Sequence, residues 1–257
     1  MSEDTIKTQE TVVAPQAFSV GAFFRRIGQT IASPVEAFSA PCSGWEWPLA
    51  VLLSGLISFS LFQIQKPYAL PEMRAAAVET LEKYKDQMPA ESYEEALAGM
   101  EKGFAQAQSV SFLTYIQTLG GILAFALVIA LMGWMAGNFF FGGSAPFWKL
   151  LTVAAFSVFA SLIGDIIHTL LVMQKETSYV YVGLGVLHPM NDKSFLYYFL
   201  RQIELGAIWR LAVVCVGCAA IYKMTAGKFA FVLAPLWLIF IAIVAALNIF
   251  TGGTIVY

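Results

Sequence analysis

Five long apolar stretches, separated by short polar breaks, constrain this chain more than any other feature of its sequence. They cover residues 45–64, 112–141, 147–173, 195–222 and 229–250. A helix of about 20 apolar residues crosses the roughly 30 Å hydrocarbon core of a bilayer. A soluble domain would instead show amphipathic segments, each with one polar face. The sequence therefore predicts an all-α membrane protein, a bundle of five transmembrane helices.

The overall composition supports this class and argues against others. Of the 257 residues, 58% are hydrophobic and 12% are charged, whereas about 25% of an average soluble domain is charged. The basic residues are dispersed and form no dense stripe, which argues against a nucleic-acid partner. The first residues are polar and acidic and lack the pattern of a cleavable signal. We therefore expect residues 1–17 to be a disordered tail and the first span to direct insertion.

A short lead-in, residues 18–43, precedes the first span. Between residues 18 and 31, apolar side chains recur every three or four residues with arginines between them, as in Phe23, Phe24, Arg25 and Arg26. This pattern predicts a cytoplasmic amphipathic helix at the membrane interface, with its apolar face toward lipid and its arginines toward phosphates. A helix packed on the bundle's own cytoplasmic face is the alternative.

A second helical turn is expected directly after that helix. Ser33 precedes Pro34, and Glu36 follows three residues after Ser33. This is the spacing of a capping box with proline at the first helical position. The sequence therefore predicts a new helix start at Pro34.

The only sizeable polar segment lies between the first two spans, at residues 66–110. It carries eight acidic and five basic residues, and apolar residues keep helical spacing over 70–84 and again over 93–104. Two short amphipathic helices that form an external hairpin are the natural interpretation. This hairpin is either a solvated cap over the bundle or a surface on which a protein partner docks.

The distribution of basic residues predicts the orientation. Arg25 and Arg26 precede the first span, Lys149 lies between spans two and three, and Lys223 and Lys228 join spans four and five. All of them fall on one side of the membrane, which the positive-inside rule identifies as the cytoplasm. We therefore expect the N-terminus inside, the C-terminus outside and the cytoplasmic (inner) membrane of a bacterium as the location.

Three segments carry a resemblance to a known family. They are FRRIGQTIASPVEAF at 24–38, GGSAPFWKLL at 142–151 and YKMTAGK at 222–228. The chain resembles bacterial Yip-domain proteins over residues 24 to 250, a family related to the eukaryotic membrane proteins that interact with Ypt/Rab GTPases. The resemblance implies a five-helix membrane domain over 44–257, with the hairpin as an insertion longer than the minimal family pattern.

The resemblance also implies a function without chemistry of its own. The family offers no catalytic signature to transfer, and its eukaryotic members look like trafficking and membrane-shaping factors that work through partners. We therefore expect a non-enzymatic protein, with no cofactor, that organises membrane or recruits proteins through the hairpin or the N-terminal segment. Its oligomeric state is open.

A few ionisable residues lie within the apolar stretches. Asp165 and His168 belong to the third stretch, and Arg201, Glu204 and Arg210 belong to the fourth. Each would cost several kcal/mol facing lipid, so we expect them to face the bundle interior and to be paired. Arg210 and His168 are expected opposite Asp165 and Glu204 where spans three and four meet.

Three interpretations of this polar cluster remain open. It can be an electrostatic clip that selects one helix packing. It can line a cavity that carries protons, an ion or a lipid headgroup, which would make the chain a small transporter, channel or lipid-translocating protein. It can also be a hydrolytic or metal centre, although Asp-x-x-His alone is a weak pattern and no established catalytic motif accompanies it.

Two further patterns are interpreted as helix packing. Cys215 and Cys218 match C-x-x-C but lie inside an apolar span among small residues, so thiol or metal chemistry is the lesser alternative. Gly133 and Gly137 form a small-xxx-small pattern, which favours close contact between helices of the same chain over dimerisation. No catalytic or metal-binding residue is assigned.

Overall fold

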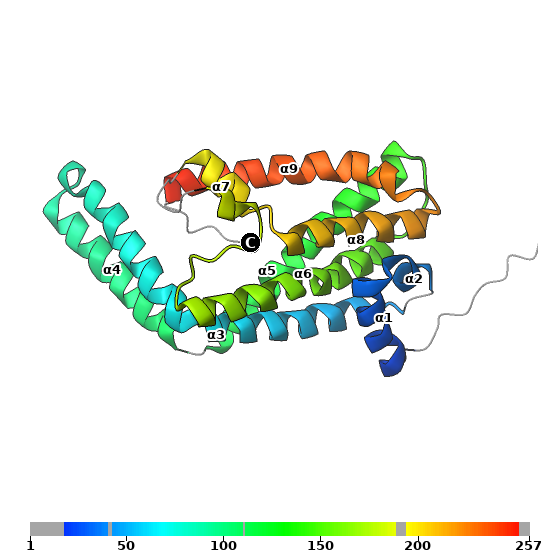
Figure 1. Ribbon diagram of the computed structural model, residues 1–257, viewed down its shortest axis with the longest axis horizontal. Coiled ribbons are helices and arrows are strands. Elements are labelled where there is room, and N and C mark those ends of the chain that lie inside the picture. Colours follow the sequence, from blue (N-terminus) through cyan, green and yellow to red (C-terminus); the bar gives the residue numbers. More distant parts are fainter. Residues whose placement is uncertain (1–17, 41–42, 110, 189–193, 252–257) are drawn as a thin grey trace, which may run out of the picture.

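The computed structural model describes residues 18–40, 43–109, 111–188 and 194–251, which are almost entirely helical (Figure 1). Among them, five helices are long and apolar enough to cross a membrane. The segments are Glu46–Lys83, Phe112–Phe140, Phe147–Lys175, Leu205–Tyr222 and Ala226–Ile249. The prediction of an all-α bundle with five spans is confirmed. The expected disordered tail and Cys42 lie outside the described residues.

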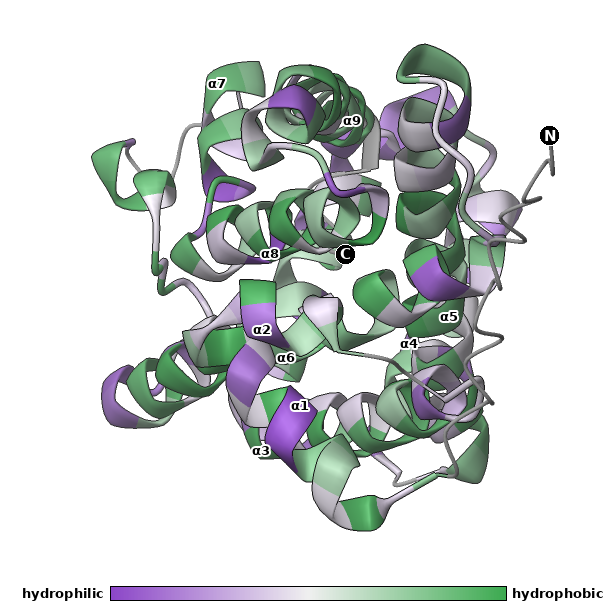
Figure 2. Ribbon diagram, turned by 90° about the vertical axis from the view of Figure 1, so that its right-hand side faces the viewer, coloured by the Kyte–Doolittle hydropathy of each residue, from purple (hydrophilic) through white to green (hydrophobic). Residues whose placement is uncertain are grey.

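Helix α6 (Phe147–Lys175) forms the centre of the bundle. It packs against α3 (Glu46–Lys83), α5 (Phe112–Met135) and α8 (Leu205–Tyr222). In its most apolar window 72% of the residues are buried, against 22–39% in the other four spans. Small side chains along α6 allow its neighbours to approach closely. The other spans keep a broad apolar face outward, and Figure 2 shows this apolar colouring around the bundle.

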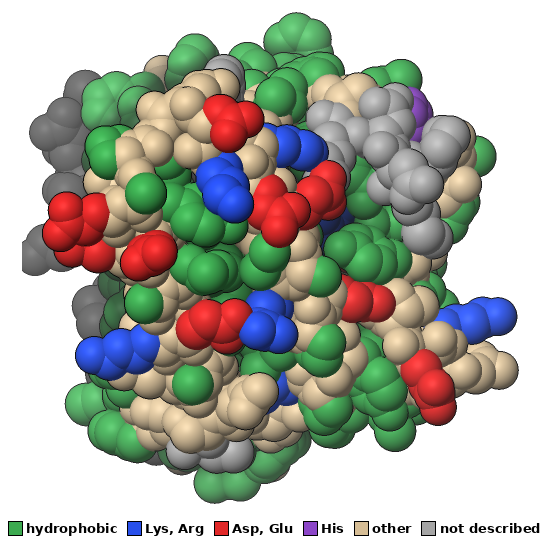
Figure 3. All heavy atoms as spheres, turned by 90° about the vertical axis from the view of Figure 1, so that its left-hand side faces the viewer, with side chains coloured by type: hydrophobic (Ala, Val, Ile, Leu, Met, Phe, Trp, Pro, Cys, Tyr) green, Lys and Arg blue, Asp and Glu red, His purple; other side chains and the backbone are tan. Residues whose placement is uncertain are grey.

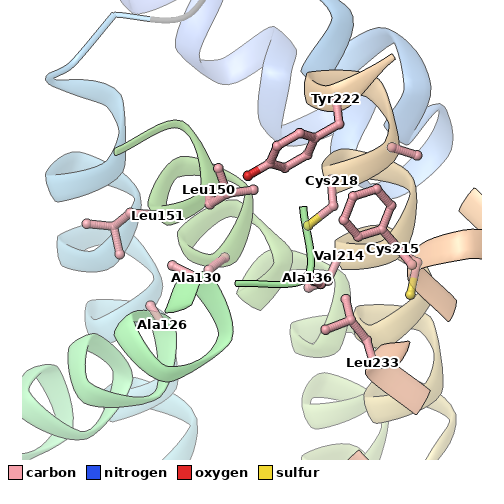
Figure 4. Packing of buried hydrophobic residues seen from close by; sticks show 13 residues of the cluster. Ala126, Ala130, Ala136, Leu150, Leu151, Val214, Cys215, Cys218, Tyr222 and Leu233 are labelled. Atoms are coloured by element: carbon pink, nitrogen blue, oxygen red, sulfur yellow. The ribbon is translucent and has the colours of Figure 1, made fainter. Parts of the chain in front are cut away.

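Helices α5, α8 and α9 (Ala226–Thr251) complete one side of the core. Figure 4 shows Cys218 and Tyr222 of α8 lying close to Leu150 of α6. A Cβ atom at Gly133 would lie 2.8 Å from the Cys218 sulfur, and one at Gly137 would lie 2.0 Å from Cζ of Tyr222. Packing within the chain therefore requires both glycines, as their spacing predicts.

The first span continues without a break into the external hairpin. Sequence analysis places a boundary near residue 66, but α3 is one helix of 38 residues that includes Pro67 and Pro71. Both prolines are exposed, so their rings lie on the outer side of the helix and not in a packed contact. After a 3-10 turn, η1 (Lys85–Gln87), α4 (Ala90–Gln108) returns along α3. The hairpin projects from the bundle (Figure 1).

Polar contacts fasten the base of this hairpin. The buried Lys66 ammonium donates to the carbonyl oxygen of Ser109, 2.9 Å away at the end of α4. A cation there complements the negative end of the helix dipole. On the other side of α3, the Glu72 carboxylate accepts hydrogen bonds from the Ser178 backbone N–H at 2.9 Å and from the hydroxyls of Thr177 and Ser178. The hairpin is thus attached to the loop that follows α6.

The fourth apolar stretch is not one helix, which differs from the sequence prediction. It divides into α7 (Phe195–Arg201) and α8, separated by residues 202–204. At this break the backbone pairs with the external loop: Leu184 N–H donates to the Ile203 carbonyl at 3.0 Å, and Leu205 N–H donates to the Val182 carbonyl at 3.1 Å. These contacts satisfy polar backbone groups that a continuous helix would satisfy internally. Helix α7 then packs against α9.

The lead-in forms two short helices, α1 (Val20–Ala32) and α2 (Pro34–Ser39). Helix α2 begins at Pro34, as predicted, but the capping box does not form. The Ser33 side chain makes no capping hydrogen bond, and the Glu36 carboxylate accepts a bond from the Gln29 amide at 3.3 Å. Proline and the backbone therefore set this helix start without the predicted side-chain cap.

A buried ion pair joins the lead-in to the first span. Nε of Arg26 lies 2.7 Å from Oε2 of Glu46, and each side chain is only 6% exposed. The same guanidinium donates to the Ala37 carbonyl at 2.8 Å, and the other Glu46 oxygen accepts the Ser43 N–H at 3.1 Å. Since buried charges are tolerated only when they are paired and hydrogen-bonded, this arrangement fixes α1 and α2 against the start of α3.

Replacement of Arg26 by alanine is expected to destabilise the protein strongly. The change leaves the buried Glu46 carboxylate without its cation, a loss of about 3–5 kcal/mol in the free energy of unfolding. Reversible unfolding in mixed micelles measures this loss. Arg25→Ala is the matched control, because Arg25 is exposed and its removal should change stability by no more than about 0.5 kcal/mol. Equal losses in the two variants would contradict the role assigned to the pair.

Candidate functional site

Helices α6 and α8 approach each other closely beside the predicted intramembrane cluster. A Cβ atom at Gly164 would lie 3.2 Å from the Gly206 Cα, and one at Gly206 would lie 2.9 Å from the Ser161 carbonyl oxygen. Gly164 directly precedes Asp165, and Gly206 follows Glu204 by two residues. The glycine contact therefore brings the backbones that carry these two acidic side chains together.

Glu204 lies at the start of α8, just before the spanning segment, as its N-terminal cap residue. This differs from its expected place inside a continuous helix. Burial raises the pKa of its carboxyl group and the carboxylate of Asp165 adds to that effect, while Arg201 and Arg210 act in the opposite direction. The charges of Asp165 and Arg210 thus both act on the Glu204 carboxyl group.

Arg210 also has an aromatic neighbour that the sequence did not indicate. Its guanidinium carbon lies 4.3 Å from the centre of the Phe125 ring on α5. A guanidinium over an aromatic face gains a cation–π attraction, which is larger where water is excluded. The charge of Arg210 is therefore stabilised from the α5 side as well as by the acidic side chains.

His168 takes a different place from the one predicted. Its Nε2 atom lies 2.9 Å from the Val180 carbonyl oxygen in the external loop. Because a carbonyl oxygen only accepts, Nε2 carries the proton in this contact. His168 therefore belongs to the attachment of the external loop, one helical turn outward of Asp165.

The four residues predicted to form a membrane-interface helix divide between two directions. Phe23 is buried and packs edge-on against Phe156 of α6, with ring centres 5.5 Å apart. Arg26 pairs with Glu46 instead of lying toward lipid phosphates. Phe24 and Arg25 are exposed. One face of α1 thus contacts the bundle, as in the alternative weighed for this segment, and another face is open.

The end of the bundle that contacts α1 also contains a polar network that the sequence analysis does not predict. Five residues directly after α5 form a π-helical turn, η2 (Ala136–Phe140), and the Asn138 side chain in it holds the turn before α6. Asn138 Oδ1 accepts from the Ala145 N–H at 3.1 Å and from the Tyr222 hydroxyl at 2.9 Å. An asparagine at the end of an apolar span, just before a glycine-rich break, is the sequence signal that predicts such a network.

The hairpin end of the molecule carries a mixed but mainly acidic surface. Figure 3 shows acidic and basic side chains gathered over that end. Arg74 of α3 is paired with Glu101 of α4, and Lys83 lies 3.0 Å from Glu79. On α4 the exposed positions include Glu91, Glu94 and Glu95. The Arg74–Glu101 pair joins the two hairpin helices, the Lys83–Glu79 pair lies within α3, and the three acids of α4 face outward.

Groups suited to metal chemistry are not gathered in the part of the chain that the structure describes. Among those residues no set of three or more His, Cys, Asp or Glu side chains is placed to hold a metal ion. Cys215 and Cys218 are buried free thiols within the α5–α8–α9 packing. Their position accords with the interpretation of this C-x-x-C as a helix contact.

Addition of one methyl group at the α6–α8 contact is expected to disturb the cluster. Gly206→Ala places a Cβ against the Ser161 backbone, which cannot move as a side chain can, and should cost about 1–3 kcal/mol. Gly121→Ala is the control, since a Cβ there meets nothing within 4 Å. Thermal unfolding in detergent should show a lower midpoint temperature for Gly206→Ala and an unchanged one for Gly121→Ala. Equal midpoints would contradict the close approach.

Comparison with known proteins identifies one matching family. A family model described as the Yip1 domain matches residues 28–247. No curated protein and no solved structure matches the chain. The match includes most of the lead-in, the hairpin and the five apolar helices, and it confirms the resemblance found in the sequence. The chain is therefore an integral membrane protein that belongs to the Yip1 domain family.

Proposed function

We propose that this protein is a non-enzymatic membrane protein that recruits protein partners through the hairpin of α3 and α4. The observation that carries the proposal is the projection of this hairpin from the bundle (Figure 1). Helix α3, with 38 residues, is about 57 Å long at 1.5 Å per residue. The hydrocarbon core takes roughly 30 Å of that length, so about half of α3 stands outside the membrane.

The hairpin is suited to binding because it is ordered in advance. Lys66 and Glu72 fasten its base, and the Arg74–Glu101 pair joins its two helices. A surface that is already ordered loses less conformational entropy when a partner binds. The contacts therefore support a docking element over a loosely attached cap.

The charge of the hairpin indicates the chemistry of the partner. Its basic residues are largely engaged: Lys66 is buried, Arg74 is paired, and Lys85 lies over the Tyr93 ring. The acids Glu94 and Glu95 remain exposed. A partner with a basic surface fits such a face, and complementary charge raises the association rate and makes it depend on salt.

The same proposal includes a location and an orientation. Lys149, Lys223 and Lys228 lie at the opposite end of the spans from the hairpin. By the positive-inside rule that end is cytoplasmic. We place the protein in a bacterial inner membrane with the hairpin outside, so its partner would be sought in the periplasmic or external compartment.

Neutralisation of the hairpin's acidic face is expected to weaken partner capture. A photo-crosslinking residue at position 98 of the full-length protein should give a reproducible product in intact cells. Glu94→Gln with Glu95→Gln should reduce that product several-fold, because the complementary charge is lost. The measurement is product yield at equal expression.

Gln106→Lys with Gln108→Lys is the matched control, with the same charge change near the base of the hairpin. Its product should remain within a factor of about two of the unmodified protein, because an exposed charge outside the contact contributes little and both residues lie at the opposite end of α4 from Glu94 and Glu95. Absence of any product, or equal loss in both double variants, would contradict docking at this face.

A transporter, channel or lipid-translocating protein is the second candidate. The observation in its favour is the break between α7 and α8, which leaves Glu204 at the start of α8, two residues from the Gly164–Gly206 contact that adjoins Asp165. Broken helices with ionisable groups at the break form substrate and ion sites in transporters. In this reading the polar cluster would carry a proton, an ion or a headgroup.

Removal of the Asp165 charge distinguishes the two candidates. If the cluster carries flux, reconstituted vesicles should show proton or labelled-lipid movement above empty vesicles, and Asp165→Asn should abolish it. Asp86→Asn, at the exposed tip of the hairpin, is the matched control and should leave flux unchanged. Wild-type flux equal to that of empty vesicles would exclude these activities.

A further inference from the structure

Helix α1 has more apolar surface than the bundle covers. At about 100° per residue, Val20, Phe24, Ile27 and Ile31 form one stripe along the helix. The face that contacts the bundle, with Phe23, Arg26 and Thr30 buried, lies about 90° away from this stripe. Val20 is 60% exposed and Phe24 is 57% exposed. The first two turns of the stripe are therefore left uncovered by the residues that the structure describes.

The depth of α1 follows from two of its contacts. Arg26 pairs with Glu46, the first residue of α3. The preceding residue, Trp45, is 73% exposed, and tryptophan is enriched at the boundary between membrane and water. Phe23 packs on Phe156, nine residues into α6 and thus about 14 Å along it. Helix α1 therefore lies level with the start of the first span and not beyond the end of the bundle.

The direction of α1 fits the plane of a membrane. Figure 1 shows it running across the long direction of the bundle, and Figures 1 and 2 both place its first turn at the edge of the molecule beside α3. Helix α3 exposes Leu49, Leu52 and Leu56 along one of its faces, as a lipid-facing helix does. The uncovered stripe of α1 thus lies at the level of a span that itself exposes apolar side chains.

We infer that Val20 and Phe24 of α1 insert into the lipid leaflet on the side of the lead-in, with the exposed Arg25 at the phosphate level. Arg25 lies about 100° from Phe24 round the helix, to one side of the apolar stripe and near the same end of α1. An apolar stripe bordered by a basic residue is the arrangement that holds a helix in the interface. This inference does not depend on the function of the hairpin.

Spin labels on the full-length protein test the insertion. Phe24→Cys and Ala32→Cys, each in a Cys42→Ser background, are labelled and reconstituted in phosphatidylcholine–phosphatidylglycerol vesicles. Ala32 is also exposed but lies about 80° from Phe24 round the helix, away from the stripe. We expect the label at 24 to collide more with oxygen than with a water-soluble nickel chelate, and the label at 32 to show the reverse.

Three outcomes would overturn the inference. A label at 24 as accessible to the nickel chelate as the label at 32 would place the stripe in water. Exclusion of both reagents would mean that protein, such as a second copy of the chain, covers it. Because Phe24→Cys removes part of the stripe, Val20→Cys serves as a second probe.

Finally, Arg25→Glu should reduce the depth of the label at Val20→Cys through repulsion from anionic lipid, and an unchanged depth would remove Arg25 from the site.

Discussion

The rest of the structure depends on the burial of α6 between its neighbours. In a membrane, apolar side chains are already away from water, so their burial between helices gains no hydrophobic free energy. The stability of a central helix therefore rests on close packing. Helix α6 achieves this with alanine and serine at its contacts and with Gly164 against Gly206. The same close contact also lies beside two ionisable groups. Gly164 directly precedes Asp165 and Gly206 follows Glu204 by two residues, so the backbones that carry both acids approach where α6 and α8 meet.

Two buried cations then fix the elements outside this core. Arg26 holds α1 and α2 to the start of α3, and Lys66 holds the end of α4 to the middle of α3. Each is paired in a manner suited to its surroundings: Arg26 with a carboxylate and backbone carbonyls, Lys66 with the carbonyl end of a helix. One helix thus carries the attachments of both the lead-in and the hairpin, so these two surfaces are held in a defined relation across the membrane.

The sequence predicted the five spans because the length and apolar character of each window are local properties. It did not predict where the helices break. Residues 195–222 form one apolar stretch apart from a few polar residues, and the break at residues 202–204 is held by hydrogen bonds with Val182 and Leu184, which lie earlier in the chain. Conversely, Pro67 and Pro71 indicate a boundary that α3 does not have. Such exposed prolines weaken a helix without ending it when its two halves are held by other contacts.

The polar residues show the same limit. Periodicity identified Arg26 as part of an amphipathic helix but not its partner, because Glu46 lies 20 residues further along the chain beside two tryptophans. His168 shares a helix face with Asp165, yet its hydrogen bond goes to Val180, whose carbonyl group has no signature in the sequence. Spacing shows which side chains share a face. Which charge or carbonyl lies opposite depends on how the helices pack, and here the Gly164–Gly206 contact and the α7–α8 break decide it.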